Sequence, residues 1–252
     1  MRVDGPESVT VQDLKVGVKA ANTDWSSYSA AYDLLAEHNP AYQDLLKGFE
    51  SFLASIDAPQ SICDLGGGTG NFAEIAARLC PGSTIHFVEP DAGMNRMAQA
   101  KLADHADVIY HTSTFEQVKA PEPVDLVVCV HALYTMPDPL DRLKEMRRLL
   151  KPGGILYLVD LGRHLNLADW RSYLFTHLKG KHGLVGALRI FWQAREIARQ
   201  NANILAAQQN GEYWVHSPED FVAAVADAGF DIIRQDTVYR GYSDLVVCRP
   251  RS

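Results

Sequence analysis

The chain has 252 residues, of which 47% are hydrophobic and 22% charged, with a formal net charge of −7. A chain of this length and composition can fill the core of one α/β domain with an insertion, without disulfide staples. The acidic balance disfavours a nucleic-acid partner, because phosphate binding usually needs a basic face. No apolar run reaches the roughly 18 residues of a membrane span, and the first 17 residues lack the apolar core of a signal peptide. We therefore expect a cytoplasmic protein with no membrane partner, whose four cysteines are buried and reduced.

Residues 1–58 are predicted to form an N-terminal arm and lid helices. The first 24 residues are polar and weakly patterned, which is typical of an arm. Apolar residues at helical spacing then run over residues 26–57 in two pieces, with a break at Asn39-Pro40.

Residues 59–162 alternate short β-prone runs with helical ones. The strands separated by helices predict a parallel sheet covered on both faces. The sequence Lys-Pro-Gly-Gly at 151–154 is expected to end the last of these helices. The expected strands are 61–65, 84–89, 107–111, 125–130 and 155–161, and the expected helices are 70–80, 92–104 and 138–150.

A helical cap is predicted over residues 163–211, with residues 183–211 as one long amphipathic stretch. The core resumes over residues 212–252. Ser217 is expected to cap a helix that begins at Pro218 and stops at Gly229. Two strands, 231–239 and 243–249, are expected to close the sheet as an antiparallel hairpin.

Four glycines follow the first strand within five positions, in the sequence "DLGGGTGNF" of residues 64–72. Such a cluster between a strand and a helix indicates the close approach of a ligand to the backbone. Two ligand classes compete for this interpretation. A dinucleotide site would have the spacing G-x-G-x-x-G, whereas here Gly66, Gly68 and Gly70 alternate with other residues and Asp64 precedes them. An acidic side chain is unfavourable beside a pyrophosphate and suits a cationic ligand.

These residues resemble the first motif of the class I S-adenosylmethionine-dependent methyltransferases. The segments "HFVEP" (86–90), "DLVVCVHALYTMPDP" (125–139) and "RRLLKPGGILYLVD" (147–160) resemble later motifs of the same family, in the same order. The resemblance covers residues 28–161 and 212–249. It implies a Rossmann-like, doubly wound, mostly parallel sheet of seven strands with an antiparallel last strand. It also implies S-adenosylmethionine as methyl donor and S-adenosylhomocysteine as product.

The resemblance also implies which residues hold the cofactor. Asp64 would lie near the methionine ammonium, and Gly66, Gly68 and Gly70 would let the backbone pass under the methionine and ribose. Glu89 would accept hydrogen bonds from the ribose diol, and a charged acceptor strengthens such bonds.

Further cofactor contacts follow from the same resemblance. Asp91 and Met94 would pack near the adenine face. Thr114 and Phe115 occupy the place where the family reads the adenine amino group, although the commoner acidic side chain is missing there. His131 would lie behind the methionine moiety.

Methyl transfer needs alignment of the acceptor and sometimes removal of a proton. Tyr28 and Tyr32, four residues apart on one helix, are candidates to touch or cover the cofactor. No metal is expected at the site. The acid–base candidates are His131, Tyr134, His164, which is expected to face the pocket, and His216.

The acceptor is expected to be a small-molecule metabolite, methylated on oxygen, nitrogen or carbon, with secondary metabolism as one setting. The loop over 131–137 is not the Asn/Asp-Pro-Pro-Tyr/Phe loop of enzymes that methylate amide or base nitrogens. The N-terminal helices and the cap are rich in aromatic residues, which suits a lid over an apolar substrate. Two alternatives stay open: an RNA or protein methyltransferase, and a catalytically silent S-adenosylmethionine-binding partner protein. The cap helices are also a candidate homodimer contact.

Overall fold

The computed structural model describes residues 25–118 and 122–251, apart from the side chains of residues 26–31 and 35. The predicted arm (1–24) and the side chain of Tyr28 therefore lie outside the described residues. The division into lid, core and cap at residues 58, 162 and 211 stays a prediction.

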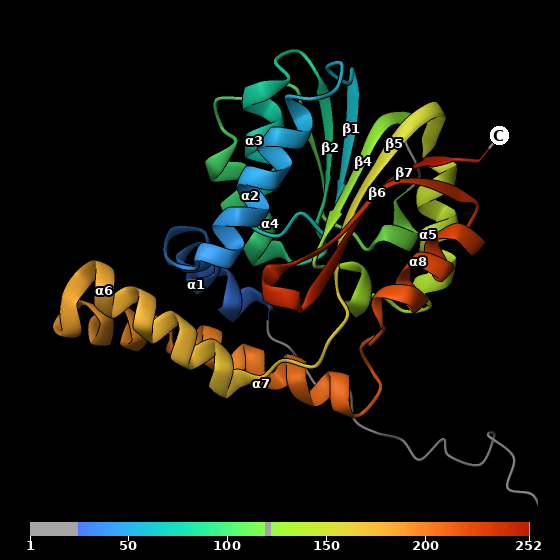
Figure 1. Ribbon diagram of the computed structural model, residues 1–252. Helices are drawn as coiled ribbons and strands as arrows, with labels where there is room; N and C mark the ends of the chain where they lie inside the picture. The colour runs from blue at the N-terminus through green and yellow to red at the C-terminus, as the bar shows by residue number, and fades with distance from the viewer. Residues whose placement is uncertain (1–24, 119–121, 252) are drawn as a thin grey trace, which may run out of the picture.

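Seven strands form one sheet in the order β3-β2-β1-β4-β5-β7-β6 (Figure 1). Strands β1 to β5 are parallel, whereas β7 pairs antiparallel with both β5 and β6. The predicted doubly wound, mostly parallel sheet with its antiparallel end is confirmed. The strands are β1 (Ser61–Leu65), β2 (Thr84–Val88), β3 (Val108–His111), β4 (Val124–Val130), β5 (Leu150–Leu161), β6 (Phe230–Val238) and β7 (Ser243–Pro250).

Helices cover both faces of this sheet (Figure 1). Successive strand residues point to opposite faces, so in β1 the side chain of Ile62 joins one core cluster and Cys63 and Leu65 join the other. The first cluster is covered by α2 (Pro40–Leu53), α3 (Asn71–Leu79) and α4 (Ala92–Lys101), and the second by α5 (Pro139–Arg148) and α8 (Pro218–Asp227). All four cysteines are free and buried, as expected.

The structure bears out the predicted helix break at Asn39-Pro40 and the predicted cap at Ser217. The side chain of Asn39 accepts a hydrogen bond from the Ala41 N–H at 3.1 Å and separates α1 (Trp25–His38) from α2. Ser217 forms a capping box with Asp220, and Pro218 is the first residue of α8.

Two expectations about helix lengths were wrong. The sequence at 151–154 does not end a helix, because α5 stops at Arg148 and the chain enters β5 at Leu150. There the Lys151 ammonium lies 2.9 Å from Asp125 and the strand pairs with β4 through an irregular register.

The cap is not one continuous helix over 183–211. Helix α6 (Leu167–Gln193) has non-helical dihedrals at Gly183 (φ 70°, ψ 175°), and it is followed after Ala194 by α7 (Arg195–Gln209). A glycine can adopt this conformation without a Cβ clash, so the helix bends there. The cap follows β5 and packs at the carboxyl ends of the strands (Figure 1). A third cluster joins it to the core: Ala41, Tyr134, Leu161, Leu165, Trp170 and Ile204.

Candidate functional site

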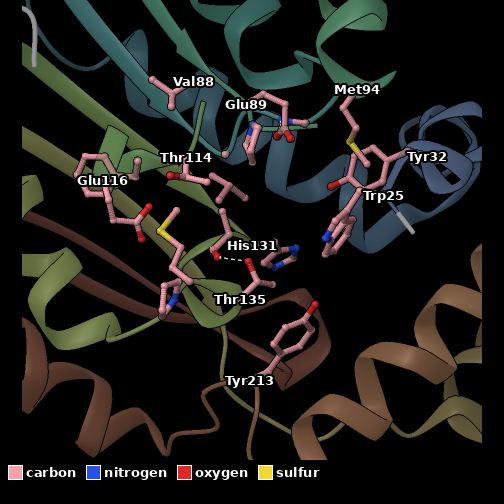
Figure 2. Close-up of a pocket in the computed structure, with 18 residues that line it drawn as sticks. Trp25, Tyr32, Val88, Glu89, Met94, Thr114, Glu116, His131, Thr135 and Tyr213 are labelled. Atoms are coloured by element: carbon pink, nitrogen blue, oxygen red, sulfur yellow. Dashed lines mark hydrogen bonds between the residues drawn. The ribbon is translucent and has the colours of Figure 1, made fainter. Parts of the chain in front are cut away.

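A cavity of about 300 Å³ lies at the carboxyl ends of the central strands (Figure 2). The order of the strands reverses between β1 and β4, and ligands of open α/β sheets bind at such a switch point. In Figure 2, Glu89, Met94 and Tyr32 lie on one side of His131, and Tyr213 lies on the other. The predicted residues in the wall are Tyr32, Gly66, Gly68, Glu89, Met94, Thr114, Phe115 and His131.

The glycine loop has two functions in the structure. Gly66 (φ 68°) and Gly68 (φ 58°) belong to the cavity wall. A Cβ on Gly66 would lie 2.4 Å from the Cβ of Ala132, so the missing side chain lets the loop after β1 meet the loop after β4. Gly70 does not line the cavity. It begins α3, and its Cβ would lie 3.1 Å from that of Ala98 in α4, so its small size serves helix packing rather than a ligand.

Glu89 follows β2 and presents a carboxylate to the cavity. Its two oxygens accept hydrogen bonds from the backbone N–H groups of Gly68 (3.0 Å) and Asp91 (2.8 Å). A carboxylate has about four acceptor positions, so two remain for a ligand. Burial raises the pKa of Glu89 to about 6, against the lowering effect of these two hydrogen bonds.

Asp64 lies in β1, behind the cavity wall, with only 3% of its surface exposed. Its Oδ2 has no hydrogen-bond partner among the described residues. Burial, followed by the negative charge of Glu89, raises its pKa to about 7. We call Asp64 and Glu89 the acidic pair. A buried carboxylate oxygen without a partner is costly, so this pair favours a ligand that carries positive charge.

The residues expected around the adenine divide into wall and support. Met94, Thr114 and Phe115 line the cavity. Asp91 does not: its carboxylate caps α4 by accepting the N–H groups of Gly93 (2.8 Å) and Met94 (2.9 Å). Asp91 thus fixes the start of α4, and its contact with a ligand stays a prediction.

His131 follows β4 with a left-handed backbone (φ 53°) and is half-buried in the wall between this cavity and its neighbour. Its Nε2 lies 2.8 Å from the Ser243 hydroxyl. Burial lowers the pKa of His131 to about 4, so the ring is neutral at pH 7. Tyr134, three residues further along the chain, is buried, and its backbone N–H donates a hydrogen bond to Asp160 Oδ1 at 3.0 Å.

Two other acid–base candidates lie outside the cavity. The expectation that His164 faces the pocket was wrong, because its side chain is exposed and belongs to no cavity wall. After β5, the N–H groups of Gly162 and Arg163 donate hydrogen bonds to the Tyr242 carbonyl. These bonds hold the chain before His164 against the segment that precedes β7. His216 is buried between two carboxylates: its Nε2 lies 3.4 Å from Asp160 Oδ2 and its Nδ1 lies 3.6 Å from Asp244 Oδ2. This arrangement places the ring in the protein interior, away from the cavity.

A second, narrower cavity of about 90 Å³ adjoins the first and lies beneath the cap. We call it the inner cavity. Trp25, Tyr32 and His131 line both. The inner cavity also holds Tyr134, and its wall includes the aromatic rings of Tyr42 and Tyr239.

Several wall residues had not been assigned to the site from the sequence. Trp25 and Tyr213 come from the two segments noted as aromatic-rich, and that composition was the one signal available for them. Glu116, an alternative to Thr114 for the adenine contact from the sequence, also lies in the wall. The remaining wall residues are brought together by the sheet order: Val88, Pro90, Val130, Ala132, Thr135, Met136 and Pro137.

Neither a metal site nor a membrane-spanning helix is found among the described residues. Within residues 25–118 and 122–251, no three His, Cys, Asp or Glu side chains gather as metal ligands would. Over the same ranges, every helix is too short or too polar to cross a bilayer.

Comparison with known proteins identifies the family. A family model described as "Methyltransferase domain" matches residues 35–235, and the chain belongs to this family. An uncharacterized methyltransferase of Geobacillus thermodenitrificans (strain NG80-2) is 25% identical over 202 residues, which is 76% of this chain and 93% of that protein. The ubiquinone/menaquinone biosynthesis C-methyltransferase UbiE of Hahella chejuensis is 26% identical over 155 residues, covering 59% of this chain and 62% of that protein.

A solved structure agrees on the fold. The N-methyltransferase NodS from Bradyrhizobium japonicum WM9, determined with S-adenosylhomocysteine, superposes with a TM-score of 0.62 at 14% identity, over 91% of this chain and 100% of that one. The class I methyltransferase family predicted from the glycine motif is confirmed, and the chain is a methyltransferase by family.

Proposed function

We propose that this enzyme transfers the methyl group of S-adenosylmethionine to a small-molecule metabolite held beneath the helical cap. The observation that carries the proposal is the pair of adjoining cavities, which share Trp25, Tyr32 and His131. The larger cavity suits the cofactor, and the inner one suits an acceptor. A long nucleic acid or a protein segment would need an open groove, whereas the inner cavity is narrow and lies beneath α6 and α7.

The residues present fit S-adenosylmethionine. Glu89 has acceptor positions left for the two ribose hydroxyls, because the backbone occupies only part of its carboxylate. Asp64, with its unpartnered Oδ2, would offset the positive charge of the methionine ammonium. Gly66 and Gly68 keep the wall free of side chains where the ligand would pass. Met94, Thr114 and Phe115 would enclose the adenine.

When bound, the cofactor supplies a methyl group on a sulfonium, which is an excellent leaving group. This chain's residues then have to align the acceptor and exclude water. Trp25 and Tyr32 line both cavities and would flank the space where donor and acceptor meet. The neutral ring of His131 can accept a hydrogen bond from an acceptor hydroxyl or amine, and Tyr134 in the inner wall can donate one. Both assignments are proposals.

The names of two relatives support a small-molecule acceptor. The UbiE relative is named for quinone biosynthesis, and a mouse acetylserotonin O-methyltransferase is 37% identical over 109 residues, 39% of this chain. One structural neighbour is a complex of a methyltransferase with a methyltransferase activator. We propose no activator for this chain. A homodimer through the cap helices stays a prediction.

A labelling experiment tests the proposal. The enzyme is incubated with methyl-tritiated S-adenosylmethionine and, in separate reactions, with a small-molecule extract, total RNA and total protein. We expect label in a small-molecule product that separates from S-adenosylmethionine, and none in RNA or protein. Label in RNA or protein would favour a macromolecular acceptor, and cofactor binding without transfer to any fraction would favour a silent binding protein.

A further inference from the structure

A third cavity continues the path through the cap. This outer groove, of about 520 Å³, lies between α1, α6 and α7. Its described wall is mostly apolar and includes Leu178, Ile190 and Phe191. It shares five wall residues with the inner cavity: Asn39, Trp170, Leu174, Ile197 and Asn201. The three cavities therefore form a row from the glycine loop to the outside of the cap.

The inner cavity is electrically neutral. Among the described residues, none of its wall side chains is an aspartate, glutamate, lysine or arginine. Its one histidine, His131, has a pKa lowered to about 4 and is uncharged. Burying an unpaired charge there would be costly, so the group bound in this cavity is uncharged.

The inner cavity nevertheless has polar wall groups. The side chains of Asn39, Tyr134 and Asn201 line it. Trp170, which is 7% exposed, belongs to both the inner cavity and the outer groove. A small polar head can therefore find hydrogen-bond partners in the inner cavity, next to the start of the outer groove.

Helix α6, which forms part of the wall of the outer groove, carries exposed apolar residues. Helix α6 carries four of the eight exposed large hydrophobic side chains among the described residues. Val185 is 81% exposed, and Trp192, which also lines the groove, is 68% exposed. The others on this helix are Leu184 and Leu188. Exposed apolar patches of this kind mark binding surfaces.

We propose that the methyl acceptor has a small uncharged polar head and a long apolar tail, with the head beside Trp170 in the inner cavity and the tail in the outer groove. This inference rests on the proposed function and names its substrate class. The shared wall is the reason to choose a ligand tail as the occupant. A second copy of the chain could cover the outer groove, but it would leave unfilled the inner cavity, which shares five wall residues with that groove.

A chain-length series tests the proposal without knowledge of the substrate. The probes are 4-ethylphenol, 4-hexylphenol and 4-decylphenol, titrated by calorimetry into the protein saturated with S-adenosylhomocysteine. Each fully buried methylene tightens binding by about fourfold. With half of that burial in an open groove, the four methylenes between ethyl and hexyl should lower Kd by about fifteenfold.

Two matched variants locate the tail. Ala198 is an exposed residue of α7 that lines the groove, and Ala206 is an exposed residue of the same helix that lines none of the three cavities. In Ala198→Trp, the gain in affinity from 4-hexylphenol to 4-decylphenol should disappear. In Ala206→Trp, this gain in affinity should remain. Both should bind S-adenosylhomocysteine as the unmodified enzyme does.

Three outcomes would overturn the inference. They are affinity independent of tail length, equal length dependence in the two variants, and a concentration-dependent dimer that Ala198→Trp disrupts in a protein that binds no alkylphenol. Each of these leaves the proposed function standing if S-adenosylhomocysteine still binds. Failure of S-adenosylhomocysteine itself to bind would instead refute the proposed function.

Discussion

Replacing Glu89 with alanine should remove most of the cofactor affinity. The carboxylate is held by the N–H groups of Gly68 (3.0 Å) and Asp91 (2.8 Å), so its remaining acceptor positions are fixed toward the cavity. A hydrogen bond to a charged group contributes about 1.5–3 kcal/mol. Loss of two such bonds to the ribose hydroxyls should weaken binding by about 3 kcal/mol or more, which is roughly 100-fold in Kd.

The assay is calorimetric titration with S-adenosylhomocysteine. Glu89→Gln serves as a milder change: its amide oxygen can still accept hydrogen bonds, but its NH₂ group faces one backbone donor, so we expect a loss of about tenfold. Glu116→Gln is the matched control. Glu116 also lines the cavity, but its carboxylate lies 3.1 Å from Arg142, which has a second partner in Glu145.

Thermal unfolding in the absence of ligand checks that each Glu89 variant is folded. The reasoning is refuted if folded Glu89→Ala binds S-adenosylhomocysteine as tightly as the unmodified enzyme. It is also refuted if Glu116→Gln loses as much affinity as Glu89→Ala, because the effect would then be one of general charge in the cavity.

Three further predictions concern the loops and the acidic pair. Gly66→Ala should lower the free energy of unfolding by about 3 kcal/mol in urea denaturation, through left-handed strain and overlap with Ala132. Gly153 has φ 80° and no atom within 4 Å of an added Cβ, so Gly153→Ala should lower the free energy of unfolding by only about 1 kcal/mol. Ala132→Gly, added to Gly66→Ala, should restore part of the lost free energy of unfolding. Because folding raises the pKa values of the acidic pair to about 7 and about 6, the free protein should lose stability as pH rises from about 4 to 7. S-adenosylhomocysteine carries a positive charge at its amine, so it should bind more tightly at pH 8, where the acidic pair is ionised, than at pH 5.5. At pH 6, binding should release about one proton from this pair, which calorimetry detects as a binding heat that depends on the buffer. An affinity independent of pH would contradict this prediction. With an acceptor in hand, His131→Asn should lower kcat/KM at least about tenfold while exposed His164→Ala leaves it unchanged; the reverse result would contradict the site.

The sheet could be predicted because its signal is local. Short apolar runs alternate with helices, and glycine, proline and capping residues mark the ends. Ser217 caps the helix that the sequence assigns to it, and the predicted break at Asn39-Pro40 separates α1 from α2. The bend at Gly183 was missed because the apolar pattern continues across it, and the missing side chain there was the one signal of a break.

The site could be predicted only in part. Gly66, Gly68 and Glu89 line the cavity where the motif places them. Gly70 and Asp91 belong to the same motifs but serve helix packing and capping, and sequence spacing does not distinguish packing from ligand contact.

The cap was harder to predict because its contacts join segments far apart in the chain. Trp25 and Trp170 meet across the inner cavity although they lie in different elements. Nothing local to either residue indicates the other. The row of three cavities depends on how α6 and α7 pack over the strand ends. Sequence spacing within either helix does not indicate this packing.

The central claim is tested most directly by titrating the unmodified enzyme with S-adenosylmethionine and with S-adenosylhomocysteine at pH 8. The account predicts one site per chain with micromolar affinity for both, roughly 8 kcal/mol of binding free energy. Absence of binding to either compound, in a protein shown to be folded, would contradict the account and assign the glycine loop to another ligand.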